Sequence, residues 1–433
     1  MSFRSLVKKF IPAKLFRTIE PYGHLIEAVI FNLLNGFPAR GLKVIGVTGT
    51  NGKTSTCFLI HRMMIEAGLP TGLMTTVGWG VGKDINPQIH HMTNVAVPEL
   101  IQRLKEMKQQ GIEWLVLETT SHALAQNRVW GIPFSVVVMT NVTHEHLDYH
   151  GTFESYRDAK LKLFKLANRN KKGLRVGIIN ADDENADLFV KSVANTLTYG
   201  LNSGDLQATD IKMTSAGSSY TAKIQTSNFK IQTNLPSGFN VYNSLAVVGV
   251  GHIIGLSKEQ IEQGIAALES VEGRMTTVDE GQPFEVIVDY AHTPDSYEKL
   301  FRELRPVVKG KMIAMFGSAG RRDKTKRPVQ GEIAGKYCDE VILTEEDDRD
   351  EDGNQILEDI AAGAEKAGKI RGKDLFLTPD RPKAIEFTLS RAKAGDTVLL
   401  LGKGHEKTIE RNEREDAYDE IAITRQTLKK QSA

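Results

Sequence analysis

The sequence predicts an α/β protein in which helices cover two successive, mostly parallel β-sheets. Short apolar segments of strand length alternate with longer segments whose apolar residues recur at helical spacing. This alternation is typical of parallel sheets covered on both faces, and it starts a second time near residue 273. A chain of 433 residues also exceeds what one hydrophobic core usually organises. We therefore expect a short helical segment (1–41), a central domain (42–271) and a C-terminal domain (272–433).

The elements expected in each domain follow from the same patterns. In the central domain we expect strands at 44–47, 114–118 and 135–140, and helices at 55–67, 98–110 and 153–166. Polar and apolar residues alternate at 220–224 and 229–231, which indicates a small antiparallel appendage. In the C-terminal domain we expect strands at 286–289, 311–316, 340–343 and 397–401, with helices at 295–305, 328–337, 354–367 and 380–393. That second pattern is Rossmann-like.

Composition excludes several classes of protein. The 55 basic and 54 acidic residues leave a formal charge of +1, so no overall field favours nucleic acid. Cys57 and Cys338 are the only cysteines, which argues against a disulfide framework or a structural zinc site. No apolar run approaches the ~20 residues of a membrane span. We expect a soluble, cytoplasmic monomer.

The first 40 residues combine basic and apolar side chains. Lys8, Lys9, Lys14 and Arg17 are interleaved with apolar residues, and a second apolar series at helical spacing follows residues 21–23, Pro-Tyr-Gly. The pattern predicts two short amphipathic helices. They either pack on the next domain or form a basic surface that touches a membrane or a lipid-linked substrate.

A glycine-rich loop follows the first expected strand and identifies this domain as P-loop-like. Residues 48–54 read Thr-Gly-Thr-Asn-Gly-Lys-Thr. Gly49 and Gly52 allow backbone N–H groups to turn toward phosphate oxygens, and the next helix points its positive end at the same anion. Lys53 can reach the outer phosphates and the Thr54 hydroxyl can bind Mg²⁺. The strict motif requires glycine at 47, where this chain has valine.

Further polar residues follow the next expected strands. Glu118 ends a strand and is a natural Mg²⁺ ligand, although a strand-end glutamate can also simply face water. The spacing of His144, His146 and His150 matches no standard zinc pattern, so magnesium with phosphate is the better interpretation. From the residues alone, Lys160 is a surface lysine that lays its stem along apolar neighbours.

Taken together, these motifs resemble those of the Mur ligase family, and within it the MurE branch of tripeptide synthetases. The resemblance covers roughly residues 42–425, in order, and is carried by residues 48–54, 118–122, 147–152, 159–160, 179–183, 239–243, 273–275, 289–296, 322–324, 326–328 and 402–406. It implies an ATP-dependent amide-bond ligase that works through an acyl phosphate and two Mg²⁺ ions.

The resemblance also implies roles for individual residues. The loop from Gly49 through Thr50, Asn51 and Gly52 to Lys53 and Thr54 would bind ATP, together with Asn243, Arg274 and Asp289. The catalytic group would be Lys53, Glu118, His146 and Lys160, and the metal ligands would be Thr54, Glu118, His146 and Lys160. Lys160 would be carbamylated, and its added carboxylate would help to place the second Mg²⁺.

The two remaining substrates have implied contacts of their own. The acceptor, a muramoyl-peptide, would contact Thr93, Thr120, Gln126 and Arg128, and the amino acid would contact Arg327, Asp347, Arg349, Gly402 and Glu406. An acidic run at 344–352 stands where the branch that adds diaminopimelate reads Asp-Asn-Pro-Arg. It favours a basic side chain such as lysine or diaminopimelate, unless it is only a solvated loop.

One departure leaves other functions open. Family members of usual size carry a UDP-gripping domain before the phosphate loop, whereas only residues 1–41 stand there in this chain. A lipid-linked acceptor, or one of folylpolyglutamate or cyanophycin type, is therefore an alternative. A nucleotide-gated module without enzymatic activity is another.

Overall fold

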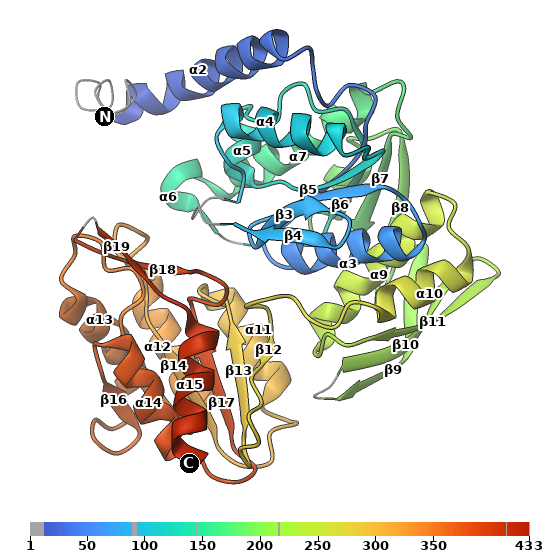
Figure 1. The fold of residues 1–433 in the computed structure, drawn as a ribbon. Helices are drawn as coiled ribbons and strands as arrows, with labels where there is room; N and C mark the ends of the chain where they lie inside the picture. Colours follow the sequence, from blue (N-terminus) through green and yellow to red (C-terminus); the bar gives the residue numbers. More distant parts are fainter. Residues whose placement is uncertain (1–12, 89–92, 144, 215–216, 413, 433) are drawn as a thin grey trace.

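The computed structural model describes residues 13–88, 93–143, 145–214, 217–412 and 414–432, and it contains two stacked α/β lobes (Figure 1). The central lobe extends from β1 to α10, and the C-terminal lobe from β12 to α15. An eleven-stranded sheet lies in the first lobe and a six-stranded sheet in the second. The α/β architecture predicted from the sequence is confirmed.

The core of the central sheet is parallel. Its strands lie in the order β8-β7-β6-β1-β5-β2, with bounds β1 Lys43–Thr48, β2 Thr71–Met74, β5 Trp114–Glu118, β6 Phe134–Met139, β7 Val176–Asn180 and β8 Asn195–Gly200. One face is covered by α3 Lys53–Glu66, α9 Gly238–Ile253 and α10 Lys258–Ala266. The other is covered by α4 Val97–Gln109, α5 Ser121–Ala125, α7 Phe153–Arg169 and α8 Ala186–Val190. The strands are almost entirely buried because both faces are covered.

Both edges of this sheet are antiparallel. At one edge lie β9 Leu206–Thr214, β10 Gly217–Ile224 and β11 Ser227–Thr233, which the alternating pattern predicted. They are continuous with the main sheet, because β9 pairs with β8. At the other edge lie β3 Gly78–Val81 and β4 Asp84–Pro87, which the sequence did not reveal.

The prediction of two N-terminal helices separated at residues 21–23 is wrong. A single helix, α2, extends over Ala13–Leu34 and contains Pro21 in its interior. Proline lacks the N–H that would bond four residues back, which costs helix stability. The helix nevertheless continues, because it packs against α4 and buries Ala28 and Asn32, and packing outweighs the local penalty. Lys8 and Lys9 lie outside the described residues.

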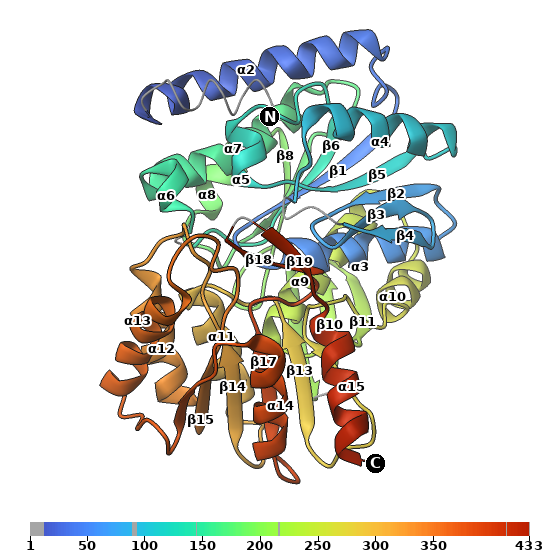
Figure 2. The ribbon, with the colours of Figure 1, turned by 60° about the vertical axis from the view of Figure 1, so that its left-hand side comes forward.

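The C-terminal lobe has a parallel sheet with one antiparallel edge strand. Its order is β12-β13-β17-β14-β15-β16, with bounds β12 Thr276–Thr277, β13 Glu285–Asp289, β14 Met312–Phe316, β15 Glu340–Leu343, β16 Leu375–Leu377 and β17 Thr397–Leu401. The helices are α11 Pro294–Leu304, α12 Lys326–Tyr337, α13 Gly353–Lys366, α14 Arg381–Arg391 and α15 Glu420–Ser432. A hairpin of β18 Thr408–Arg411 and β19 Arg414–Ala417 projects toward the central lobe (Figure 2).

The two lobes enclose one large cavity of about 1450 Å³. Its walls include the segments that follow β1, β5, β6 and β7 in the central lobe and the segment that follows β13 in the C-terminal lobe. Ligands of open parallel sheets gather at these carboxyl ends. None of the described helices combines the length and the apolarity needed to cross a lipid bilayer.

Candidate active site

The glycine-rich loop lies between β1 and α3 and is held by neighbouring chain segments. Gly52 has φ +83° and precedes the first residue of α3, and a Cβ there would lie 2.3 Å from Asn243 Oδ1. Only glycine fits this conformation in this space. The Thr50 N–H donates to the Asn141 carbonyl at 2.8 Å, and the Asn51 N–H donates to Asn141 Oδ1 at 2.9 Å. The loop is therefore fixed in shape before any ligand arrives.

Lys160 lies beneath this loop and is almost completely buried. Its Nζ donates to the carbonyl of Gly49 at 2.5 Å and lies 4.5 Å from the centre of the Tyr156 ring. Burial, and after it the charge of Lys53, lowers the pKa of Lys160 well below the usual lysine value. The interpretation of Lys160 as a surface lysine is wrong, because α7 points this side chain into the interior.

Glu118 and Thr54 form a pair of oxygen donors beside the loop. The register of β1 and β5 sets Val47 opposite Glu118. The Thr54 hydroxyl donates to Glu118 Oε2 at 3.0 Å, and the Thr76 N–H donates to the same oxygen. Because Glu118 is only 1 % exposed, it is not a strand-end glutamate facing water. Adjacent oxygens on a Mg²⁺ octahedron are about 3 Å apart for bonds of ~2.1 Å, so this pair fits one edge of that polyhedron.

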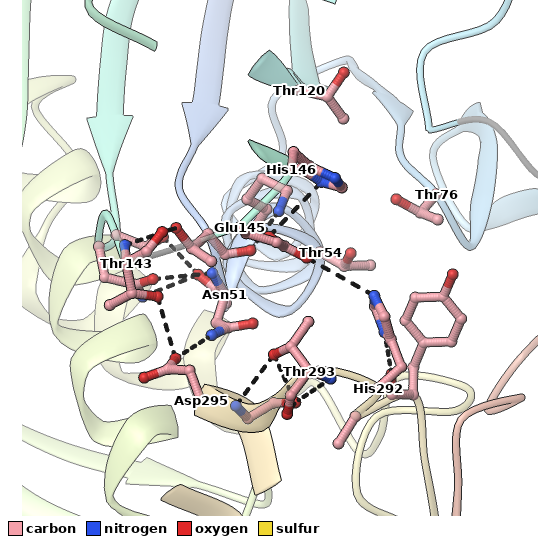
Figure 3. A pocket seen from close by; sticks show the side chains of 18 of the residues that line it. Asn51, Thr54, Thr76, Thr120, Thr143, Glu145, His146, His292, Thr293 and Asp295 are labelled. Atoms are coloured by element: carbon pink, nitrogen blue, oxygen red, sulfur yellow. Dashed lines mark hydrogen bonds and ion pairs between the residues drawn. The ribbon is translucent and has the colours of Figure 1, made fainter. Parts of the chain in front are cut away.

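Histidines border the same region. The His146 ring lies 4.7 Å from that of His122, and its Nε2 lies 3.7 Å from Glu145 Oε2 (Figure 3). Burial in the cleft, followed by the charge of Lys160, lowers the pKa of His146, so the imidazole is neutral and can act as a metal ligand. Among the described residues, no three His, Cys, Asp or Glu side chains converge to hold a metal by themselves. A metal here would need further oxygens, and nucleotide phosphates supply such oxygens.

Residues of the C-terminal lobe reach across the cavity to this site. The Arg274 guanidinium donates to the Thr54 hydroxyl at 3.4 Å and stacks on the Tyr290 ring at 4.6 Å. Asp295, in the first turn of α11, accepts hydrogen bonds from Asn51 Nδ2 at 2.8 Å and from the Thr143 hydroxyl at 3.2 Å (Figure 3). The site is thus shared between both lobes.

His292 adds a further contact between the lobes. Its Nε2 lies 3.8 Å from Glu145 Oε1, and its Nδ1 is bonded to its own lobe through the Tyr290 carbonyl. Burial, and then the charge of Lys326, lowers the pKa of His292 to about 4. The contact therefore involves a neutral imidazole at neutral pH.

The far end of the cavity in the C-terminal lobe is acidic. Lys403, which is fully buried, lies 3.0 Å from Asp347 Oδ1 and 2.5 Å from Glu406 Oε2. Glu346 lines the cavity beside them and is 6 % exposed, and its Oε2 has no hydrogen-bond partner. Burial raises the pKa of Glu346. An unpartnered buried carboxylate oxygen is costly, and a cationic group would satisfy it.

The opposite end of the cavity lies under α2. Thr93, Thr120, Gln126 and Arg128 line it, together with Glu20 and His24 of that helix. Asn94 organises these residues, since its Oδ1 accepts from the N–H and hydroxyl of Thr120 and its carbonyl accepts from Arg128. This end presents hydroxyl, amide and guanidinium groups suited to a polar acceptor.

The structure brings most residues predicted for the site to one cavity. Those lining it are Thr50, Asn51, Gly52, Lys53, Thr54, Thr93, Glu118, Thr120, Gln126, Arg128, His146, Asn243, Arg274, Asp289, Asp347, Arg349 and Glu406. Gly49 and Lys160 lie directly behind the phosphate loop. Gly402 lies behind Glu346, where a Cβ would lie 2.7 Å from Oε2.

Two arginines predicted to bind the amino acid already have protein partners. Arg327 is 1 % exposed and pairs with Asp359 and Glu351, each at 3.0 Å, and it does not line the cavity. Arg349 lines the cavity, but its Nε donates to Glu410 and one terminal nitrogen donates to the Gly320 carbonyl. The geometry gives Arg327 a structural contact. Its role with the amino acid stays a prediction.

Sequence reasoning missed several residues that line the cavity. They are Glu145, His292, Asp295, Arg322, Lys326 and Glu346. Each lies inside or next to a motif noted in the sequence, but no spacing rule links α11 to the phosphate loop. Proximity to a predicted motif was the only available signal.

This combination defines a class of protein: an enzyme whose phosphate loop lies in one α/β lobe and whose nucleotide site is completed by a second lobe. Comparisons with known proteins narrow the class. Models for the Mur ligase middle domain and the Mur ligase glutamate ligase domain match residues 47–251 and 273–404.

Individual relatives agree with this match. A UDP-N-acetylmuramyl-tripeptide synthetase of Roseiflexus sp. (strain RS-1) is 42 % identical over 91 % of this chain and 80 % of its own length. A UDP-N-acetylmuramoyl-L-alanyl-D-glutamate–2,6-diaminopimelate ligase of Geobacillus thermodenitrificans is 38 % identical over 95 % of this chain and 84 % of its own. A solved structure of a ligase of that name is 33 % identical, with a TM-score of 0.63 over 91 % of this chain and 80 % of the other.

The chain belongs to the Mur ligase family. Members of this family are ATP-dependent acid–amino-acid ligases, and the chain is an enzyme of that kind.

Proposed function

We propose that this ligase uses ATP to join a diamino acid to the D-glutamate carboxylate of a muramoyl-peptide precursor of peptidoglycan. One observation carries the proposal: a single cavity contains the phosphate loop, a polar end under α2 and an acidic end with the unpartnered oxygen of Glu346. Three substrates can therefore meet in one enclosed space. The names of the relatives describe ligases for such a precursor and for 2,6-diaminopimelate.

The phosphate loop and its surroundings are suited to ATP with Mg²⁺. Lys53 donates to the Thr50 carbonyl at 2.7 Å, so its ammonium already lies over the loop. Thr54 and Glu118 are assigned as ligands of one Mg²⁺ and His146 as a ligand of a second, with Asn243, Arg274 and Asp289 as further ATP contacts. When bound, the metal ions would neutralise phosphate charge and polarise the transferred phosphoryl group.

Carbamylation of Lys160 is part of the same proposal. A carbamate forms only on a neutral amine, and burial with the charge of Lys53 lowers the pKa of Lys160. The side chain lies under Gly49, next to the assigned positions of phosphate and metal. A carbamate would turn a buried cation into an anion that divalent ions could bind.

The reaction proceeds in two balanced steps. The acceptor carboxylate attacks the γ-phosphorus of ATP, the bond to the β–γ bridging oxygen breaks, and ADP leaves. The neutral amine of the diamino acid then attacks the acyl carbon, inorganic phosphate leaves, and the nitrogen loses a proton. Lys53 and Arg274 offset the repulsion between the carboxylate and the triphosphate. The contacts of Asp295 with the phosphate loop hold the lobes together and limit water entry.

Selection of the amino acid rests on the acidic end of the cavity. Lys403 already compensates Asp347 and Glu406. Glu346 retains a free oxygen and is assigned as the partner of the distal ammonium of the substrate. Gly402 is required behind it, because a larger residue would displace the Glu346 carboxylate. Arg349 is assigned to the α-carboxylate.

The acceptor would lie at the polar end, with Thr93, Thr120, Gln126 and Arg128 as its contacts. Helix α2 stands where usual family members carry their UDP-gripping domain. The division into residues 1–41, 42–271 and 272–433 is proposed on the same basis.

The direct test is an ADP-release assay with the full chain, ATP and Mg²⁺. UDP-N-acetylmuramoyl-L-alanyl-D-glutamate would be supplied with L-lysine, L-ornithine, meso-diaminopimelate or L-norleucine, and the product would be identified by mass spectrometry. We expect ADP release and tripeptide formation with a diamino acid but not with norleucine, which lacks the distal ammonium. Turnover only with a folate, cyanophycin-type or lipid-linked acceptor would contradict the proposed acceptor.

A further inference from the structure

Helix α2 exposes a continuous apolar stripe. Among the described residues, twelve large apolar side chains are exposed, and six of them lie on this helix. They are Ile19 (48 % exposed), Tyr22 (66 %), Ile26 (60 %), Ile30 (47 %), Leu33 (61 %) and Leu34 (77 %). Spacings of three and four residues set them on one face of the helix. The other six exposed side chains are spread over the rest of the chain.

The opposite face of α2 is the one that packs on the central lobe. Ala28 and Asn32 are completely buried, and Asn32 Nδ2 donates to the Trp130 carbonyl at 3.3 Å. Asn127 Nδ2 donates to the Pro21 carbonyl at 3.2 Å. The helix is therefore fixed with its apolar stripe outward. In both views α2 is the outermost described element, on the side of the central lobe away from the C-terminal lobe (Figures 1 and 2).

The charge next to the stripe has one sign. Residues 1–19 include Arg4, Lys8, Lys9, Lys14 and Arg17 and no aspartate or glutamate. The whole chain, by contrast, has a formal charge of only +1. Five positive charges beside an exposed apolar face are complementary to a surface that is both apolar and anionic.

We propose that the outer face of α2 lies on an anionic membrane surface, with the helix parallel to the membrane plane. The stripe would enter the boundary between headgroups and acyl chains, and Tyr22 is of the aromatic type that favours this depth. The basic residues of 1–19 would contact lipid phosphates. A protein partner could also cover an apolar stripe, but the absence of acidic residues from 1–19 favours a polyanionic surface over a mixed one.

The position of the helix relative to the cavity gives the contact a consequence. Glu20 and His24, on the inner side of α2, line the acceptor end of the cavity. A membrane bound to the outer face would therefore lie one helix away from that end. The enzyme would work at the membrane surface, where acceptor carried by lipid is concentrated.

The test is flotation of the full chain with vesicles of phosphatidylcholine, with and without phosphatidylglycerol. We expect binding to the anionic vesicles only, weakened when salt is raised above about 0.1 M. The double variant Ile26→Asp/Ile30→Asp should reduce the bound fraction about tenfold, because two charges would have to enter the apolar boundary. Its ADP release with a water-soluble acceptor should be unchanged.

Matched controls separate a specific face from general stickiness. Met213→Asp/Ile370→Asp alters two side chains, each 53 % exposed, that lie outside α2, and it should bind like the unaltered chain. Lys8→Glu/Lys9→Glu should remove the dependence on phosphatidylglycerol.

Three results would overturn the proposal. They are failure of the unaltered chain to float, equal flotation of the Ile26→Asp/Ile30→Asp variant, and a dimer in sedimentation velocity that this variant dissociates in the absence of vesicle binding. The last result would assign the stripe to a second copy of the chain. None of these results depends on whether the proposed ligase activity is found.

Discussion

The side-chain amide of Asn51, at the tip of the phosphate loop, donates a 2.8 Å hydrogen bond to the carboxylate of Asp295 in the C-terminal lobe. The same carboxylate oxygen accepts from Thr143 and lies 2.9 Å from Lys299. Asp295 therefore joins two loops of the central lobe to α11. A single residue senses whether the lobes are closed.

Asp295→Ala should weaken closure over the nucleotide. Hydrogen bonds to a charged group contribute about 1.5–3 kcal/mol, and this one is partly open to water, so we expect kcat/KM for ATP to fall about tenfold. Steady-state kinetics with varied ATP would show this. In a double-mutant cycle with Asn51→Ala, the two losses should be less than additive. Glu358→Ala, in an exposed pair with Arg371, is the control and should leave kcat/KM unchanged.

Glu346→Gln should impair use of the diamino acid. The variant keeps the shape of the side chain but removes the charge that would face a distal ammonium, so KM for that amino acid should rise about 10- to 100-fold. KM for ATP should stay the same. Asp348→Asn alters the same acidic run at a residue that does not line the cavity, and it should behave like the unaltered enzyme. Equal KM values for both variants would rule out the assigned role of Glu346.

Lys160→Ala should abolish ligation while leaving the fold intact. The side chain supports the Gly49 carbonyl and is the assigned site of carbamylation. A small carboxylic acid added to the variant should restore part of the ADP release, because it can supply the missing carboxylate. Lys162→Ala, an exposed lysine of the same helix, should remain active. Full activity of Lys160→Ala would refute this role.

Glu351→Gln should destabilise the C-terminal lobe in a pH-dependent manner. A backbone hydrogen bond from Arg321, with Lys324 and buried Arg327 as further partners, lowers the pKa of Glu351 to about 2 from an ordinary value of 4.5. A lowered pKa in the folded state stabilises the fold above pH 4.5, and this contribution disappears as the pH falls toward 2.

At pH 7 we therefore expect the free energy of unfolding of Glu351→Gln to be about 2 kcal/mol lower than that of the unaltered chain. The difference should shrink as the pH falls below 4.5, as measured by urea unfolding at several pH values. Glu358→Gln, in a pair with both side chains more than 40 % exposed, should change stability little at any pH. A pH-independent difference would show that Glu351 acts through packing alone.

Local patterns account for most of the secondary structure. The strands Trp114–Glu118, Glu340–Leu343 and Thr397–Leu401 coincide with their predicted ranges, because apolar runs of strand length are visible in any window of the sequence. The edge strands β3 and β4 were missed because Gly78–Val81 and Asp84–Pro87 are short and rich in glycine and polar residues. They become strands only through pairing with β2.

The sequence by itself determined the alternation of strands and helices, the phosphate loop and the family to which the chain belongs, since each depends on residues near one another in the chain. Tertiary structure alone decided that α2 continues through Pro21, that Lys160 points inward, that Asp295 meets Asn51 and that Glu346 keeps a free oxygen. The physical reason is that burial and hydrogen-bond partners are set by segments up to 244 residues apart, whose proximity no local spacing encodes.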